Sequence, residues 1–261
     1  MMKAKELIEF ITRNITVGER TCDTVKSGDT QKEIRKVAIT MLPTAKMLTE
    51  AIEWGADMII EHEPIYFNHM DEHIDSPVTL KKEELVKRSG AVLFRFHDYP
   101  HTHRPDMIDA GFISALGIDV KETEKVRGGH LFVSSAPMTA KEFALLVEEK
   151  LKIAHVRICG STDTPCTKFA FCLGAPGDIF ETVVRDDVEC VVIGEVCEWR
   201  VAEYVRDAAF FGMNKSLLVL GHVGSERNGM ELMCKELKSL FPSIEFKYFD
   251  NEEVYTYTDK L

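Results

Sequence analysis

The sequence predicts an α/β protein with a candidate domain boundary at residues 121–129, and three observations carry this prediction. Patterns typical of helices and of strands alternate along the chain with short joints between them, as in sheets flanked by helices. Four strand-like apolar runs each lead into a histidine or a glutamate, and the carboxyl ends of strands are where open α/β sheets bind ligands. A charged, glycine-ended passage at residues 121–129 separates halves with a similar order of elements. We therefore expect domains at residues 1–127 and 128–261.

Helices are predicted where apolar residues recur at steps of three and four and where end signals flank the pattern. Gly55 is placed to end one helix, and Ser76 with a first-turn proline is placed to begin the next. Thr139 and Glu142 have the spacing of a capping box. The expected helices are residues 5–12, 43–54, 77–88, 108–116, 139–151, 179–185, 199–211 and 226–240.

Strands are predicted for short apolar runs bounded by glycine, proline or charged residues. The expected strands are residues 37–41, 57–60, 91–96, 130–134, 156–159, 169–173, 190–193, 217–220 and 244–249. The polar stretch 18–36 is expected to be a loop at the surface or beside the active site, and residues 64–75 and 97–106 are also expected to be loops.

The composition is that of an ordinary globular protein, with 45% hydrophobic and 29% charged residues among 261. The formal charge of −11 argues against nucleic-acid binding, which depends on clustered lysine and arginine. The first thirteen residues lack the apolar core of a signal peptide, and no apolar run is long enough to span a membrane. These features predict a cytoplasmic protein.

The seven cysteines favour reduced thiols, most of them buried, over a disulfide framework. Their number is odd, several lie within apolar runs, and no C-x-x-C pair occurs. A zinc-finger site is not expected, because no two pairs have the spacing of ligands.

The histidines and glutamates that follow the four apolar runs are the candidate functional residues. They are His62 and Glu63 after the first run, His97 and His101 after the second, Glu195 after the third, and His222 and Glu226 after the fourth. Imidazole and carboxylate together suit zinc, manganese or iron, and their number exceeds the needs of one tetrahedral ion. Four isolated histidines are interpreted as surface or core residues, namely His69, His73, His130 and His155.

Two other kinds of site are weighed against a metal centre. Ser225 lies beside His222 and Glu226 but lacks the G-x-S-x-G pattern of a nucleophile, so we interpret it as the N-cap of the helix that follows. The turn from Gly174 to Gly177 could bind a phosphate at a helix N-terminus. It lacks the P-loop lysine, however, and a plain turn is the preferred interpretation.

Four segments in this order resemble the Nif-three-like dinuclear metal-centre family, also called the type-two GTP cyclohydrolase I family. They are residues 55–64, Phe96-His97 with His101, Gly194-Glu195-Val196, and Gly221-His222 with Glu226. The resemblance extends over about residues 5 to 250 and implies a two-lobed α/β fold of mixed sheets flanked by helices, with a metal site in the cleft between the lobes. It also implies two divalent ions per subunit (zinc, iron or manganese) and a homohexamer.

The resemblance assigns the metal ligands position by position. His62, His97, His222 and Glu226 match ligands of the family, and Glu226 takes the position of the metal-bridging glutamate. Glu63 stands where the family has a second histidine, and His101 stands where it has an aspartate. We interpret the two departures as compensating, because the numbers of neutral and anionic ligands are unchanged. The alternative is that one ion is weakly held or absent.

The function expected from this resemblance is metal-dependent hydrolysis of a nucleotide ring or a phosphoester by metal-activated water. Glu195 and Glu226 are the expected catalytic residues, with Glu195 as a proton shuttle or as a group that orients a ligating histidine. The alternative is a non-catalytic, metal-binding hexameric assembly or regulatory protein. A nucleic-acid-binding role is disfavoured by the acidic charge.

Overall fold

The computed structural model describes residues 2–260 and divides into two compact units, each formed by separate stretches of chain. Unit 1 contains the chain up to Ile108 and Gly229–Glu252, and unit 2 contains Asp109–Asn228 and the chain from Glu253 onward. This division differs from the single boundary expected after residue 127. The chain returns to unit 1 because strand β11 (Glu245–Tyr248) pairs with β2 (Lys36–Thr40).

The charged passage at residues 121–129 lies inside a sheet and does not link two domains. Strand β5 (Val120–Val126) pairs in antiparallel fashion with β6 (Gly129–Thr139), and the glycine-containing turn joins the two strands. Alternating charged residues are typical of an edge strand with one solvated face, and β5 is at the edge of its sheet.

The sheet of unit 1 places the ends of β3 and β4 side by side. Within the described residues its strand order is β1-β4-β3-β2-β11, with β1 (Val25–Ser27), β3 (Met58–Glu61) and β4 (Val92–Arg95). Strands β2, β3, β4 and β11 are parallel, and Glu61 at the end of β3 lies opposite Arg95 at the end of β4. The histidines that follow these strands therefore start from the same edge of the sheet.

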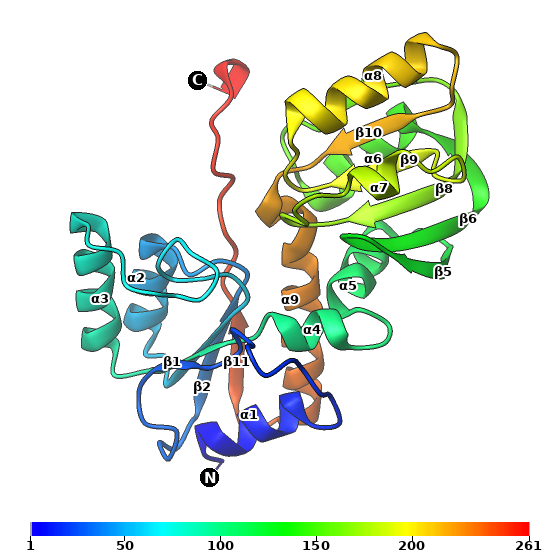
Figure 1. Cartoon of the computed structure of the whole chain (residues 1–261). Coiled ribbons are helices and arrows are strands. Elements are labelled where there is room, and N and C mark those ends of the chain that lie inside the picture. The colour runs from blue at the N-terminus through cyan, green and yellow to red at the C-terminus, as the bar shows by residue number, and fades with distance from the viewer. Residues whose placement is uncertain (1, 261) are drawn as a thin grey trace. The chain divides into compact units, whose positions relative to one another are not determined.

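Helices α2 (Ala45–Trp54) and α3 (Pro77–Ser89) cover one face of this sheet, as Figure 1 shows. Alternate strand residues on that face pack with both helices in one buried cluster, which includes Ile59, Leu93, Leu48 and Val86. Helix α1 (Ala4–Thr12) packs against the chain just after the long helix α9 (His222–Leu240). The rings of Phe10 and Phe241 have centroids 4.7 Å apart there.

The sheet of unit 2 has three parallel strands at its centre. Its order within the described residues is β5-β6-β8-β9-β10-β7, with β7 (Arg157–Gly160), β8 (Pro165–Cys172), β9 (Cys190–Ile193) and β10 (Ser216–Val219). Strands β8, β9 and β10 run parallel, and the outer pairings are antiparallel. The loops that carry Gly174, Glu195 and His222 leave the carboxyl ends of these three strands.

Helices cover both faces of the unit 2 sheet. Ala170 and Cys172 of β8 belong to a buried cluster with residues of α7 (Phe180–Val183), the π-helical turn η1 (Glu198–Ala202) and α8 (Glu203–Phe210). Phe169 and Phe171 alternate with them and face α6 (Ala140–Leu151) and α5 (Met107–Leu116). Their rings lie 5.1 Å from Phe143 and 5.3 Å from Phe112, respectively. A 3₁₀ turn, η2 (Thr258–Lys260), ends the described chain.

Several helix ends confirm the signals in the sequence. Gly55 ends α2 with φ of +81°, and the Ser76 hydroxyl caps α3 by accepting from the Thr79 amide. Thr139 and Glu142 form the expected capping box at α6. The predicted strands and helices are present to within a few residues, because local periodicity and end signals specify them.

Three predictions of loops and helices were wrong in detail. The expected loop at residues 97–106 contains a short helix, α4 (Asp98–Thr102), and the expected loop at residues 18–36 contains β1. The expected helix at residues 199–211 begins as the π-helical turn η1 and continues as α8.

All seven cysteines are free and five are buried, as predicted. Among residues 2–260, no helix is both long and apolar enough to cross a bilayer.

Candidate metal centre

Three histidines of unit 1 form a compact imidazole group. His62 directly follows β3, His97 follows β4, and His101 lies in α4. One ring nitrogen from each lies within 4.8 Å of the others. The ring centroids are 4.6 Å apart for His62 and His97 and 5.1 Å apart for His97 and His101. His62 is fully buried and the other two are partly exposed, so the group is open to solvent on one side.

The Nδ1 atom of each histidine in this group forms a hydrogen bond with an oxygen. His62 Nδ1 lies 3.0 Å from the Phe96 carbonyl, His97 Nδ1 lies 3.0 Å from Asp98 Oδ1, and His101 Nδ1 lies 3.0 Å from Asp106 Oδ2. An oxygen partner at one nitrogen fixes the orientation and tautomer of the ring and leaves Nε2 to serve as the ligand. This pattern is typical of metal-binding histidines.

Glu63 joins the group through its carboxylate. Glu63 Oε1 lies 3.5 Å from His97 Nε2, and Glu63 Oε2 lies 3.6 Å from Nη2 of Arg95. Glu63 is buried, so its charge needs these partners or a cation. Arg95 is completely buried, and its guanidinium also donates to the carbonyl oxygens of His62 (3.1 Å) and His69.

A buried ion pair also stabilises the loop that follows β3. Lys26 Nζ lies 3.1 Å from Asp71 Oδ2, and Asp71 Oδ1 accepts the Ile65 amide at 2.6 Å. Glu61, at the end of β3, is fully buried nearby, and burial followed by the charge of Asp71 raises its pKa to about 8. Glu61 is therefore mostly protonated at neutral pH, and we do not count it among the anionic ligands.

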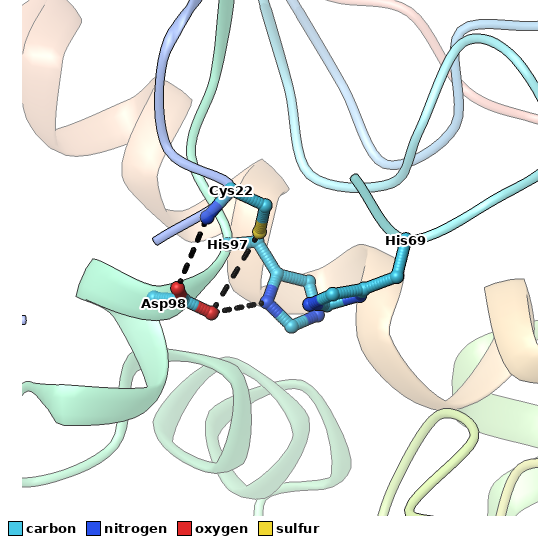
Figure 2. A group of neighbouring side chains, drawn as sticks. All are labelled: Cys22, His69, His97 and Asp98. Carbon is cyan, nitrogen blue, oxygen red and sulfur yellow. Dashed lines mark hydrogen bonds and ion pairs between the residues drawn. The ribbon is translucent and has the colours of Figure 1, made fainter. Parts of the chain in front are cut away.

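A second donor group in unit 1 contains Cys22, His69, His97 and Asp98 (Figure 2). One ligand atom from each lies within 4.8 Å of the others. Burial, followed by the neighbouring carboxylates, raises the pKa of Cys22 to about 12, despite an opposing effect of Arg95. The hydrogen bond from His97 holds the pKa of Asp98 well below its usual value. Partial burial and the nearby His97 and Arg95 lower the pKa of His69, which favours its neutral form.

In unit 2, His222 lies between two glutamates. Its Nδ1 is 2.9 Å from Glu195 Oε1, and its Nε2 is 3.2 Å from Glu226 Oε2. Helix α9 begins at His222, four residues earlier than expected, and this puts His222 and Glu226 on one helix face at i and i+4. The Glu195 side chain is 60% exposed and that of Glu226 is 4% exposed, so the two carboxylates have different environments.

We expected Ser225 to be the N-cap of a helix, but it is not. It lies within the first turn of α9, where its hydroxyl donates to the His222 carbonyl at 2.8 Å and accepts the Gly174 amide at 2.9 Å. Ser225 thus ties the loop after β8 to the helix that carries His222. The hydroxyl is fully buried and used in both bonds, which disfavours a role as nucleophile.

Gly174 leaves space that the Glu226 carboxylate fills. A Cβ atom built at Gly174 would lie 2.2 Å from Glu226 Oε1, and Gly174 also has φ of +66°. The turn therefore positions a glutamate, and the preference for a plain turn over a phosphate site missed this role. Gly177, in the same turn, has φ of +74° but open space around its Cβ position.

We expect Gly174→Ala to displace the Glu226 carboxylate and to lower the affinity for divalent ions. Gly177→Ala is the matched control, because it carries a similar cost of about 1 kcal/mol for positive φ without the clash. Zinc titration calorimetry and urea unfolding of both variants separate the two effects. Equal zinc affinities for the two alanine variants would contradict a ligand role for Glu226.

The four histidines expected in the core or at the surface are placed as follows. His130 is buried and its Nδ1 lies 2.7 Å from Asp109 Oδ2, whereas His73 and His155 are exposed partners of Glu83 and Asp259. The interpretation of these three as core or surface residues is consistent with these contacts. His69 differs, because it belongs to the donor group with Cys22, and His130 lies in a buried donor group with Asp106 and Asp109.

The chain is similar to known proteins over most of its length. A family model described as Duf34/NIF3 (NGG1p interacting factor 3) matches residues 2–253. The chain belongs to the NIF3 family. A relative from Clostridium acetobutylicum named "GTP cyclohydrolase 1 type 2 homolog" is 26% identical over 219 residues, covering 81% of this chain and 79% of the relative. A Campylobacter jejuni protein of the same name is 26% identical over 220 residues, covering 82% and 81%.

Solved structures match the NIF3 fold over nearly the whole chain. A Bacillus cereus protein related to NIF3 superposes with a TM-score of 0.78 at 14% identity, covering 99% of both chains. The protein ybgI, of unknown function, superposes with a TM-score of 0.79 at 19% identity, covering 97% of this chain and 99% of that one. The family resemblance and the α/β fold of mixed sheets flanked by helices are therefore confirmed.

Proposed function

We propose that this protein is a hydrolase that depends on divalent metal ions, about two per chain. One observation carries the proposal: His62, His97, His101 and His222 each have Nδ1 held by an oxygen at 2.9 to 3.0 Å. Such partners orient an imidazole and raise its basicity as a ligand. His73 and His130 have a similar Nδ1 partner, but His62, His97 and His222 directly follow strands and His101 lies four residues after His97. The repetition of the arrangement at this position favours metal binding.

The residues present fit divalent ions of borderline softness. The proposed ligands are three imidazoles and Glu63 in unit 1, and His222 with the buried Glu226 in unit 2. Imidazole nitrogen and carboxylate oxygen suit zinc, iron or manganese better than magnesium or calcium, which prefer oxygen alone. The space that Gly174 leaves for Glu226 supports a role that requires this carboxylate in one position.

A divalent ion bound by these groups supplies Lewis acidity and lowers the pKa of water toward neutrality. The protein's own side chains orient the ligating imidazoles and transfer protons. Glu195 fixes the His222 ring through Oε1, and its exposed side chain has a second carboxylate oxygen that can accept a proton from the solvent side. Glu195 is thus proposed as the group that orients His222 and shuttles a proton.

The substrate class is proposed from the chemistry and from the names of relatives. The protein has a net charge of −11, but two bound cations would attract an anionic substrate locally. The relatives named GTP cyclohydrolase 1 type 2 homolog support a purine nucleotide as the first substrate to test. A phosphoester is the second, because paired divalent ions serve many phosphoesterases.

We expect metal-free protein reconstituted with zinc, iron or manganese to bind about two ions per chain and to gain hydrolytic activity. Elemental analysis measures the ions, and chromatography of GTP and a nitrophenyl phosphoester panel measures hydrolysis. Glu226→Gln should remove activity, whereas Glu231→Gln, on the same helix, should retain it. Fewer than about half an ion per chain after reconstitution would reject the metal centre.

Metal removal separates catalysis from a purely structural role. A catalytic centre predicts that chelation leaves a folded, inactive protein that recovers activity with metal. Unfolding on chelation, together with no hydrolysis of either substrate class by the reconstituted protein, would instead support the alternative of a non-catalytic metal-binding protein. Circular dichroism and the substrate panel, run on the same samples, decide between the two.

A further inference from the structure

We propose that Cys22, His69, His97 and Asp98 form a separate site for a thiophilic divalent cation such as zinc. Cys22 Sγ lies 3.7 Å from Asp98 Oδ1, and the same carboxylate oxygen lies 3.0 Å from His97 Nδ1 (Figure 2). One donor atom from each of the four residues lies within 4.8 Å of the others. Sulfur, two imidazoles and one carboxylate are a donor set of tetrahedral zinc.

The two ring nitrogens of His97 face different ligand groups. Nε2 lies 3.5 Å from Glu63 Oε1, on the side of the three-imidazole group, whereas Nδ1 lies 3.0 Å from Asp98 Oδ1. The Cys22 group therefore has its own side of His97, and Cys22, His69 and Asp98 are not ligands of the proposed hydrolytic centre, in which Asp98 only orients His97. An ion at each group would share one imidazole between them.

The surrounding chain holds Cys22 and Asp98 in place. Asp98 Oδ2 accepts the Thr21 hydroxyl at 2.7 Å and the Cys22 amide at 3.4 Å, which turns Oδ1 toward the thiol. Asp23 accepts the amides of His97 and Asp98, both at 2.9 Å, and so fastens the Cys22 segment to the start of α4. The donors are positioned by contacts with groups outside the proposed ligand set.

The environment of Cys22 favours a cation ligand over a reactive thiol. The thiol is 1% exposed and lies within 3.5 to 3.7 Å of the carboxylates of Asp23 and Asp98. Negative neighbours disfavour a thiolate nucleophile, whereas a bound cation stabilises the thiolate and both carboxylates together. Binding releases the thiol proton to solvent, and it also releases the His97 ring proton when Nε2 holds an ion of the other group. His69 is exposed, so the group has a side from which an ion can enter.

Cobalt(II) titration of the metal-free, full-length protein tests the site. We expect a thiolate-to-cobalt charge-transfer band in the near ultraviolet that saturates at about one ion of this type per chain. Cys22→Ser should remove the band. His69→Ala should lower the cobalt affinity measured by titration of this band by about 10- to 100-fold. Zinc should displace the cobalt and abolish the band.

The exposed Cys197 provides the matched control, because an adventitious thiolate–cobalt band would come most easily from it. Cys197→Ser should keep the band. Should Cys22→Ser fold poorly, His69→Ala still tests the site, because that side chain is exposed. A wild-type protein without the band at saturating cobalt, or a band that persists in Cys22→Ser, overturns the proposal.

This proposal does not rest on the hydrolase function, and it adds one ion to the two per chain proposed for the hydrolytic centre. A charge-transfer band with no hydrolysis would support the Cys22 site alone. Two bound ions and hydrolysis without the band would support the hydrolytic centre alone.

Discussion

Replacing Arg95 with methionine is expected to lower the free energy of unfolding by about 3 to 5 kcal/mol, the usual cost of breaking a buried ion pair. The guanidinium is completely buried and contacts the carbonyls of His62 and His69 as well as the carboxylates of Asp71 (3.4 Å) and Glu63 (3.6 Å). Methionine fills a similar volume but leaves these oxygens without their cation.

The effect should extend to metal binding, because Arg95 fixes the loop that carries the ligands. Between Glu63 and α3, Phe67 and Asp71 have positive φ values of 64° and 57°, which are unfavourable for residues other than glycine. The contacts of Arg95 and Lys26 with Asp71 hold this loop in place. Without Arg95, His62 and Glu63 lose their support, and we expect weaker zinc binding as well.

Urea unfolding of the metal-free protein measures the stability change, and calorimetry measures zinc affinity. Arg88→Met is the matched control, because Arg88 is exposed near the end of α3 and should change stability by less than about 0.5 kcal/mol. Arg95→Lys should fall between the two, since lysine keeps the charge but not the planar fork of donors. Equal stabilities of the methionine variants at positions 88 and 95 would refute the role assigned to Arg95.

The candidate residues at strand ends could be predicted because the signal is local. An apolar run followed directly by histidine or glutamate locates both the strand and its carboxyl end. Parallel pairing of β3 with β4 and of β9 with β10 then places these carboxyl ends at the same edge of each sheet. Helix boundaries were predicted equally well wherever a cap residue marks them, as at Gly55 and Ser76. His222 shows the limit, because Ser225 was interpreted as the N-cap and the start of α9 was therefore placed four residues late.

The Cys22 group could not be predicted, because long-range pairing creates it. Cys22 and Asp98 are 76 residues apart, and the three-residue strand β1 brings them together by pairing Val25 with Phe94. A strand of this length has too few residues for a readable alternation. The surrounding stretch is polar, so it was expected to be a loop.

Burial of charge was the other feature hidden from the sequence. Arg95 occupies the end of an apolar run, where a charged side chain usually turns to solvent. It is buried because the loop after β3 folds back and presents backbone oxygens to it. The discontinuous units have a similar cause. The β11–β2 pairing joins residues about 200 positions apart, and spacing along the chain carries no sign of it.

Replacing Glu63 with histidine and His101 with aspartate, as the family resemblance implies for these positions, is expected to give a strongly non-additive double-mutant cycle. Glu63→His alone leaves the ligands one carboxylate short, and His101→Asp alone leaves them one carboxylate too rich. Each should lower metal affinity by about 10- to 100-fold. The double variant should recover most of the affinity, because it restores the numbers of imidazole and carboxylate ligands.

The geometry of unit 1 supports this coupling through His97. Glu63 Oε1 lies 3.5 Å from His97 Nε2, and the His101 ring lies 5.1 Å from the His97 ring, so both residues contact the same imidazole. An aspartate at position 101 would also lie near Asp106, and a bound cation offsets that repulsion. The single variant His101→Asp should therefore be the less stable of the two singles when metal is removed.

Glu72 and His73 offer a matched control for the exchange. Both are exposed on the loop after β3, outside the imidazole group, and Glu72→His with His73→Asp makes the same change of charge. Zinc titrations of the control single and double variants should match the wild type. If Glu63→His and His101→Asp instead lose affinity additively, with the double variant worse than either single, the two are not coupled ligands. The proposed ligands would then be His62 and His97 in unit 1, and His222 and Glu226 in unit 2.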